Sequence, residues 1–205
     1  MSLLREIQND IAGSGSDIVS VLRKCKILAS RLGSKEFAQW VAWELDGYPD
    51  SQPTPDYRRL TITYYASFFG MGWEVQKAAI PLQVVPPEHH DRFTFVEFRD
   101  GIAKADSLAR STHGVTVARP ELAFAVQGKM YPQLQCHNVW GEISPIEFQQ
   151  ILSAVRNRIL DFSLSIEAEN PDAGEAPPNS QPIPQETTAS RSKFFSWQRR
   201  CCCAE

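Results

Sequence analysis

The fold class is decided by one stretch, Leu60-Thr61-Ile62-Thr63-Tyr64-Tyr65-Ala66-Ser67-Phe68, where the spacing of the apolar residues changes. Leucine, isoleucine, tyrosine, alanine and phenylalanine take every second position there, which predicts a β-strand with one buried face. Gly70-Met71-Gly72 follows and predicts a hairpin turn into a second strand near residues 73–79. Further strands are expected over residues 93–98 and 133–143. We therefore predict a small, mainly antiparallel sheet.

Upstream of this stretch, the apolar residues recur at steps of three and four, the spacing of one buried helix face. They predict a first helix around residues 3–11, a second over 17–32 and a third that ends at Gly47. Gly33 is expected to cap the second helix, and Ser34 to begin the third. Turns this short require the three helices to fold back on one another.

The clearest predicted element is a long helix near the C-terminus. Ser144-Pro145-Ile146-Glu147 combines a capping box with a proline at the first helical position. Apolar residues then follow at steps of four and three: Phe148, Leu152, Val155, Ile159, Phe162 and Ile166. Asn170-Pro171 predicts the end of this helix. The expected fold is thus α+β, with an N-terminal three-helix segment, the small sheet and a long C-terminal amphipathic helix. Shorter helices are expected near residues 102–109 and 120–126.

The composition shifts abruptly after residue 170. We predict one domain over residues 1–170 and a Pro-rich linker and tail over 171–205. Residues 172–185 hold four prolines and no apolar periodicity, so disorder is expected. The last residues place three aromatic side chains among arginines and a lysine, ahead of Cys201-Cys202-Cys203. Such a tail suits an acidic protein surface, or weak contact with an anionic membrane.

Several function classes are disfavoured by composition. The net charge is −3 and the sequence pI about 5.8, which makes nucleic acid an unlikely partner. No stretch approaches the roughly 18 apolar residues of a membrane-spanning helix, and the N-terminus does not resemble a signal peptide. Cys25 and Cys136 are isolated, so no disulfide framework is expected. We predict a cytoplasmic protein.

No stretch of the sequence carries a complete metal or catalytic motif. His89-His90-Asp91 is the densest group of possible metal ligands, but adjacent histidines in an extended segment point in opposite directions. No phosphate-binding loop or nucleophile elbow is present. We therefore predict no metal, no cofactor and no catalytic residue.

One helical segment invites comparison with an enzyme. Ribonucleases of the HEPN group use an arginine, a following polar residue and a histidine one turn on. Arg156-Asn157 matches the first half, but Asp161 stands at the histidine position. An aspartate is a poor acid–base group near neutral pH. The simpler interpretation is that Arg156 and Arg158 pair with acidic neighbours in the fold, and a toxin-like ribonuclease stays an alternative.

Two stretches together resemble a known family. The stretch from Trp40 to Pro49, WVAWELDGYP, resembles the W-x-x-x-E-L-x-G-Y signature of AbiTii domains. The stretch from Val155 to Phe162 is similar to that family's C-terminal helix. Between them, Tyr57-Arg58 enters a strand as the family's order requires. The resemblance extends over roughly residues 2–171.

The resemblance implies a bacterial protein linked to abortive infection, in which an infected cell halts or dies before phage can spread. It carries over no catalytic residue. By their positions the signature residues are structural, and Glu44 interrupts an apolar helix face, where it is expected to pair with a basic residue. The family-signature positions are Trp40, Glu44, Leu45, Gly47, Tyr48, Arg156, Asn157, Arg158 and Asp161.

We therefore expect an accessory or regulatory domain that acts by binding protein partners. A self-associating scaffold is a further alternative, since Tyr64, Tyr65 or Phe69 would form an apolar patch if exposed. The surface distinguishes these hypotheses. A basic, concave surface around Arg156 would favour the ribonuclease, whereas a flat apolar patch would favour partner binding or self-assembly.

Overall fold

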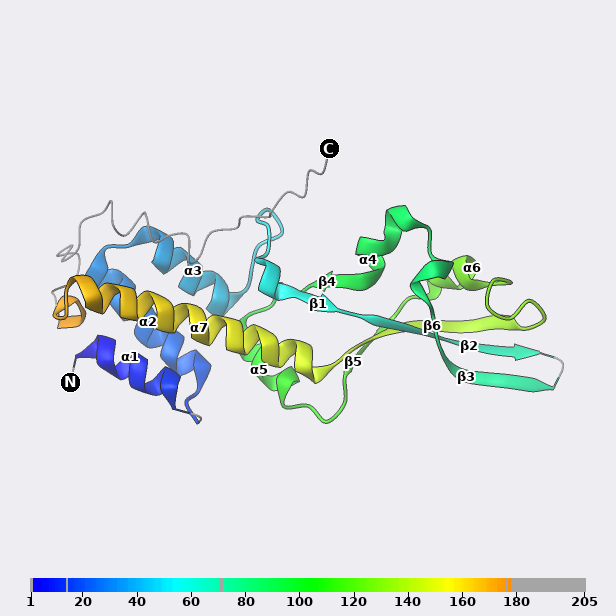
Figure 1. Ribbon diagram of the computed structural model, residues 1–205, viewed down its shortest axis with the longest axis horizontal. Coiled ribbons are helices and arrows are strands. Elements are labelled where there is room, and N and C mark those ends of the chain that lie inside the picture. The colour runs from blue at the N-terminus through cyan, green and yellow to red at the C-terminus, as the bar shows by residue number, and fades with distance from the viewer. Residues whose placement is uncertain (1, 14, 71, 176, 178–205) are drawn as a thin grey trace. The chain divides into compact units, whose positions relative to one another are not determined.

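The computed structural model describes residues 2–13, 15–70, 72–175 and 177. It has the predicted α+β fold with a long C-terminal helix (Figure 1). The strands form two small antiparallel sheets, where a single sheet was expected. The contacts divide the chain into two compact units. The first comprises Met1–Arg58, Arg99–Ser107 and the chain from Gln149 on, and the second comprises Arg59–Phe98 and Leu108–Phe148.

The first unit begins with the three predicted helices, α1 (Leu3–Ala12), α2 (Ile18–Leu32) and α3 (Lys35–Asp46). Side chains close their N-terminal ends, because the first N–H groups of a helix have no partner within it. Asp17 accepts from the N–H groups of the first turn of α2, and the Ser34 hydroxyl accepts from Phe37 N at 3.3 Å. Gly33 ends α2 in the left-handed conformation, with φ of 65°, as expected for a glycine cap.

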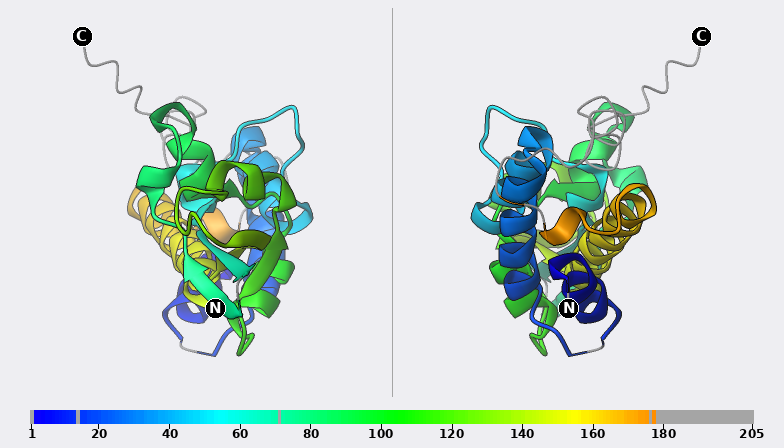
Figure 2. Two further views of the ribbon diagram at one scale, coloured as in Figure 1. Left: turned by 90° about the vertical axis from the view of Figure 1, so that its right-hand side faces the viewer. Right: turned by 90° about the vertical axis from the view of Figure 1, so that its left-hand side faces the viewer.

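The long helix α7 (Pro145–Glu169) completes this bundle from residue 149 on. Figure 1 shows α1, α2, α3 and α7 running alongside one another, and the right view of Figure 2 looks along them. The Phe37 and Phe162 rings, 4.2 Å apart at their centroids, join α3 to α7. The buried apolar side chains of the four helices are Leu4, Ile7, Ile11, Ile18, Val21, Leu22, Cys25, Leu28, Ala29, Leu32, Phe37, Trp40, Val41, Ile151, Val155, Ile159, Phe162 and Ile166.

The start of α7 differs from the prediction in two ways. Ile151 is fully buried and Leu152 only half-buried, so the apolar stripe runs through Ile151. The capping box is not formed either. The Ser144 hydroxyl accepts from Ile146 N at 3.3 Å, while the Glu147 carboxylate accepts from the backbone N–H of Thr61 at 2.7 Å. Glu147 thus serves a neighbouring strand rather than its own helix.

The chain turns back onto the first unit after α7. Ala173–Glu175 form the 3₁₀ turn η5, in which Ala173 is fully buried. A Cβ added at Gly174 would lie 2.9 Å from the Leu4 nitrogen, and the Arg31 guanidinium donates to the Gly174 carbonyl. The domain boundary at residue 170 stays a prediction. The expected disorder from residue 172 on is wrong for Ala173–Glu175, because burial against the helices orders this turn. Residue 176 and the chain from residue 178 on, with the tail chemistry, lie outside the described residues.

The second unit holds both sheets. The larger has the order β3-β2-β6-β5, and the smaller pairs β1 with β4, with every neighbouring pair antiparallel. The strands are β1 (Arg59–Thr61), β2 (Thr63–Gly70), β3 (Trp73–Ala79), β4 (Phe95–Glu97), β5 (Val115–Ala118) and β6 (Gln135–Ile143). The alternation predicted from Leu60 to Phe68 is confirmed, because every second side chain there is buried. The short β5 was not predicted, and helix α4 (His90–Thr94) takes the start of the strand expected over 93–98.

One face of the larger sheet is covered. Helix α6 (Ala123–Val126) packs Val126 against a core formed by Ala66, Phe68, Ala78 and Val139. Phe93 of α4 contacts the Tyr64 ring at 5.5 Å, on the same face. The remaining elements are α5 (Ile102–Ala109) and the 3₁₀ turns η1 (Asp56–Arg58), η2 (Leu82–Val84), η3 (Pro87–His89) and η4 (Pro120–Leu122). No helix in the described ranges is long and apolar enough to cross a membrane.

Candidate functional site

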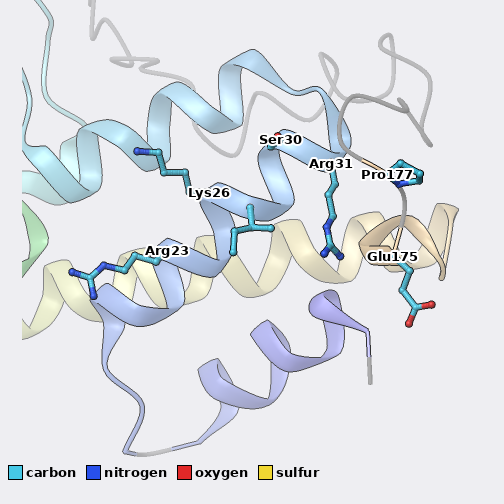
Figure 3. Close-up of a pocket in the computed structure, with 7 residues that line it drawn as sticks. Arg23, Lys26, Ser30, Arg31, Glu175 and Pro177 are labelled. Carbon is cyan, nitrogen blue, oxygen red and sulfur yellow. The ribbon is translucent and has the colours of Figure 1, made fainter.

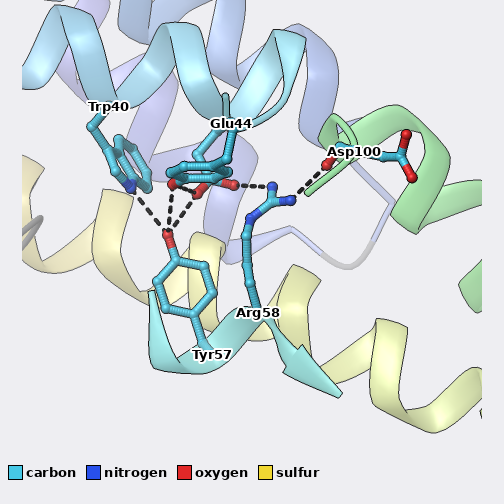
Figure 4. A network of polar contacts seen from close by, with 6 residues as sticks. Trp40, Glu44, Tyr57, Arg58 and Asp100 are labelled. Carbon is cyan, nitrogen blue, oxygen red and sulfur yellow. Dashed lines mark hydrogen bonds and ion pairs between the residues drawn. The ribbon is translucent and has the colours of Figure 1, made fainter. Parts of the chain in front are cut away.

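The family-signature residues of α3 meet in a polar network inside the first unit (Figure 4). Glu44 and Arg58 are both fully buried, and the Arg58 Nη2 atom lies 2.6 Å from the Glu44 Oε2 atom. Arg58 also donates through Nη1 to the Asp100 carbonyl at 2.6 Å. The expected pairing of Glu44 with a basic residue is therefore confirmed, and Arg58 is the partner.

The other oxygen of Glu44 serves two phenols. The hydroxyls of Tyr48 and Tyr57 each donate to the Glu44 Oε1 atom at 2.5 Å. The indole N–H of Trp40 donates in turn to the Tyr57 hydroxyl at 3.1 Å. Three signature residues, Trp40, Glu44 and Tyr48, thus close one hydrogen-bonded cluster with Tyr57-Arg58, the pair that enters the first strand.

Backbone packing explains the glycine of the signature. Gly47 ends α3 with φ of 103°, a conformation that disfavours any residue with a Cβ. A Cβ there would lie 2.8 Å from the Arg99 carbonyl oxygen, and the Tyr48 N–H donates to that same oxygen at 2.7 Å. A Cβ at Gly101 would collide with the Leu45 carbonyl. The exit of α3 therefore packs on the segment from Arg99 to Gly101.

Burial and charge fix the protonation of this network. Burial raises the pKa of Tyr48 and of Tyr57, and the negative charge of Glu44 raises both further. Burial alone would lower the pKa of Arg58, but the attraction of Glu44 outweighs it and the pKa is raised. Arg58 thus stays charged, and both phenols stay protonated as donors. With the carboxylate and guanidinium closed off from solvent, the network joins α3 to η1 and does not present a reactive surface.

The ribonuclease-like residues of α7 are not assembled into a site. The Arg156 guanidinium donates to the Ser16 carbonyl at 2.6 Å, and that of Arg158 lies 4.1 Å from the centroid of the Tyr57 ring. Asn157 and Asp161 are exposed. The expected acidic partners were wrong, since neither arginine forms an ion pair within the described part of the chain. All four histidines of the sequence belong to the second unit.

His90 and Asp91, the possible metal ligands beside His89, have ordinary partners. A ring nitrogen of His90 lies 2.9 Å from the Val85 carbonyl, and Asp91 forms an ion pair with Arg59 at 2.7 Å. No group of three or more possible metal ligands is found within residues 2–13, 15–70, 72–175 and 177.

A different surface of the second unit carries clustered aromatic side chains. Tyr65 of β2 faces Trp140 of β6 directly in the strand register, and their rings stack at 6.1 Å with an interplanar angle of 28°. Phe69 of β2, 46% exposed, contacts the exposed His137 edge to face at 5.4 Å. Tyr65 alternates with the buried Tyr64 and Ala66, so it points away from the covered side of the sheet. We call Tyr65, Phe69, His137 and Trp140 the aromatic sheet face.

An ion pair holds the centre of the aromatic sheet face in place. Glu142 accepts from the Lys77 ammonium at 2.7 Å and from the Trp140 indole at 2.9 Å. The Lys77 nitrogen lies 4.4 Å from the centroid of the Tyr65 ring. The hydrogen bond from Lys77, followed by that from Trp140, lowers the pKa of Glu142. Both rings are therefore held by charged side chains, Lys77 of β3 and Glu142 of β6.

The sequence identified this surface only in part. Of the aromatic residues proposed for an apolar patch, Tyr64 is buried and was placed wrongly, Tyr65 is half-buried and Phe69 is exposed. Trp140 and His137 were missed, since only the pairing of β6 with β2 brings them to the same face. The alternation of β6 itself is the signal that would have located Trp140.

Comparison with known proteins supports the predicted resemblance. Residues 2–191 match the family model described as AbiTii. This match spans nearly the whole chain and includes all nine signature positions. Neither curated proteins nor solved structures returned a match.

Proposed function

The chain belongs to the AbiTii family, and we propose that it acts in abortive infection by binding a protein partner through the aromatic sheet face. The family name associates it with bacterial defence against phage. The proposal adds an accessory or regulatory role that depends on protein binding rather than on catalysis.

The observation that carries this proposal is the Tyr65–Trp140 stack at the surface. Tyrosine and tryptophan dominate the energetic centres of protein interfaces, because they bury much area while losing little side-chain freedom. Here Lys77 and Glu142 already fix the two rings, so little further ordering is required on binding. The aromatic sheet face is thus preorganised for binding.

Charge favours a protein over a nucleic acid as the partner. Proteins that bind single strands stack bases on aromatic side chains, but they add a groove of free cations for the phosphates. On the aromatic sheet face, Lys77 is neutralised by Glu142. The ribonuclease alternative gains no support. Arg156 lies on α7, which packs into the core, and its guanidinium donates to the backbone carbonyl of Ser16.

Site-specific crosslinking in bacteria challenged with phage would test the proposal. A photoreactive amino acid at His137, which is exposed on the aromatic sheet face, should capture a specific protein, and the additional change Trp140→Ala should abolish the capture and the protection. Phe124→Ala is the matched control, since Phe124 is an 89% exposed aromatic on α6, which covers the opposite side of the sheet.

The outcomes separate the candidate partners. Capture of a second copy of the chain would identify self-association as the binding event. If Trp140→Ala leaves both capture and protection at the level of Phe124→Ala, the aromatic sheet face is not the binding surface. Thermal unfolding of each variant shows whether a loss reflects binding or misfolding.

A further inference from the structure

Helix α2 concentrates positive charge in an otherwise acidic protein. Its fifteen residues include no aspartate or glutamate and four basic residues, against a net charge of −3 for the chain. Lys24 is neutralised by Glu6 and Asp10 of α1, at 3.2 and 2.9 Å. The other three, Arg23, Lys26 and Arg31, line a groove on the outer side of α2.

The groove runs along α2 and ends at η5 (Figure 3). Its volume is about 550 Å³, within the range of small-molecule sites. The hydrogen bond from Arg31 to the Gly174 carbonyl holds η5 at the C-terminal end of α2. The lining residues are Arg23, Lys26, Ile27, Ser30, Arg31, Glu175 and Pro177.

The lining combines cationic side chains with an apolar surface. Arg23 and Lys26 are exposed, and neither forms an ion pair within the parts of the chain that the structure describes. Three cationic side chains stand against one carboxylate, that of Glu175. Between the cations Ile27 is 51% exposed, beside the hydroxyl of Ser30. The groove therefore suits a molecule with an anionic end and an apolar or ring-shaped body.

We propose that this groove binds a small organic phosphate. A guanidinium matches two phosphate oxygens at once, and an ammonium adds a point charge. Arg23 and Lys26 would hold the phosphate, the Ser30 hydroxyl would donate a further hydrogen bond, and Ile27 and Pro177 would contact the organic part. A bare phosphate ion would leave most of the groove empty. This site is independent of the aromatic sheet face.

Calorimetric titration of the full chain at low salt tests the site, with adenosine monophosphate as probe and adenosine and inorganic phosphate as comparisons. We expect saturable binding of the nucleotide, at least tenfold tighter than either comparison. The double variant Arg23→Gln/Lys26→Gln should weaken nucleotide binding at least tenfold. Lys35→Gln should not, because Lys35 is exposed on the first turn of α3 and does not line the groove.

Three results would overturn the proposal. Equal affinities for adenosine and for the nucleotide would mean that the phosphate is not recognised. Equal affinity for inorganic phosphate would reduce the groove to a simple anion site. Unchanged nucleotide binding in the double variant, with its melting temperature preserved, would place the ligand elsewhere.

Discussion

Glu44 brings a carboxylate into the interior of the first unit, where an unpaired charge is very costly. Arg58 offsets that cost, and two phenols satisfy the remaining oxygen. A buried ion pair contributes little net stability, but removing one partner strands the other. The importance of this pair therefore appears only when it is broken.

Arg58→Met should reduce the free energy of unfolding by about 3–5 kcal/mol, because Glu44 would stay buried without its cation. Glu44→Gln/Arg58→Met should recover part of that loss, since no charge is then left unpaired. Urea denaturation of the single and double variants gives the coupling energy. A loss below about 1 kcal/mol in Arg58→Met would show that water reaches Glu44 easily.

The two phenols of the network predict a loss of stability in alkali. Their pKa values are raised by burial and by Glu44, so Tyr48 and Tyr57 ionise in the unfolded chain, near pH 10, before they do in the folded protein. Above that pH the folded state binds more protons than the unfolded state. Their contribution is therefore complete below about pH 10 and lost as the pH rises beyond it.

Denaturation at several pH values between 8 and 11.5 would measure this effect. The double variant Tyr48→Phe/Tyr57→Phe should lose stability less steeply above pH 10 than the unmodified chain does, although it starts less stable. Tyr131→Phe, in the second unit, serves as the control and should keep the original slope. Identical slopes in all three proteins would contradict the protonation assigned to the network.

How far the sequence predicts this network depends on the residue. Glu44 was conspicuous because a carboxylate interrupts an apolar helix face, and that alone required a basic partner. Arg58 is fully buried although its own surroundings in the sequence are polar, so only the folded chain identifies it. The partners of Arg156 and Arg158, a carbonyl and an aromatic ring, leave no charge pattern that the sequence could show.

At the scale of elements, α7 shows how periodicity locates a helix better than it locates a face. Steps of three and four permit either Ile151 or Leu152 between Phe148 and Val155. Burial in the folded chain selects Ile151, which is fully buried, whereas Leu152 is half-buried. The short strand β5 escaped prediction because four residues are too few to establish an alternation.

Ile151→Ala should therefore cost about 2–5 kcal/mol in the free energy of unfolding, through lost burial and the cavity left behind. Leu152→Ala should cost clearly less, because half-burial leaves room for water to replace the side chain. Chemical denaturation of both variants makes the comparison within one helix and one turn. Equal losses in the free energy of unfolding would mean that Ile151 is no more a part of the apolar stripe than Leu152, the residue that periodicity alone suggested.

At the scale of the whole molecule, the contacts form two units built from interleaved segments, and the single domain over residues 1–170 stays a prediction. Residues 99–107 belong to the first unit although strands flank them on both sides in the sequence, because Gly101 and Arg99 pack on the end of α3. The unit to which residues 99–107 belong is decided by contacts between residues far apart in the sequence. Composition and periodicity do not predict such contacts.

The position at which the first unit ends, near the C-terminus, leads to a last prediction. Ala173 is fully buried, Gly174 packs on Leu4, and Arg31 donates to the Gly174 carbonyl. A chain that ends at residue 177 keeps these contacts and should unfold like the full-length protein, because the Pro-rich sequence beyond it has too little apolar surface to pack. A chain that ends at residue 170 loses the hydrogen bond from Arg31 to Gly174 and the burial of η5, a cost of about 1–3 kcal/mol.

Thermal and urea unfolding of the two shortened chains beside the full-length protein would decide the matter. Arg31→Gln in the full-length chain removes the hydrogen bond to the Gly174 carbonyl but keeps η5. It should lower the free energy of unfolding by about 0.5–1.5 kcal/mol, a part of the loss expected for the chain that ends at residue 170. If ending the chain at residue 170 changes nothing, η5 contributes no stability and the predicted boundary stands. If ending it at residue 177 already destabilises the protein, residues of the tail pack on the domain, and the compositional argument fails.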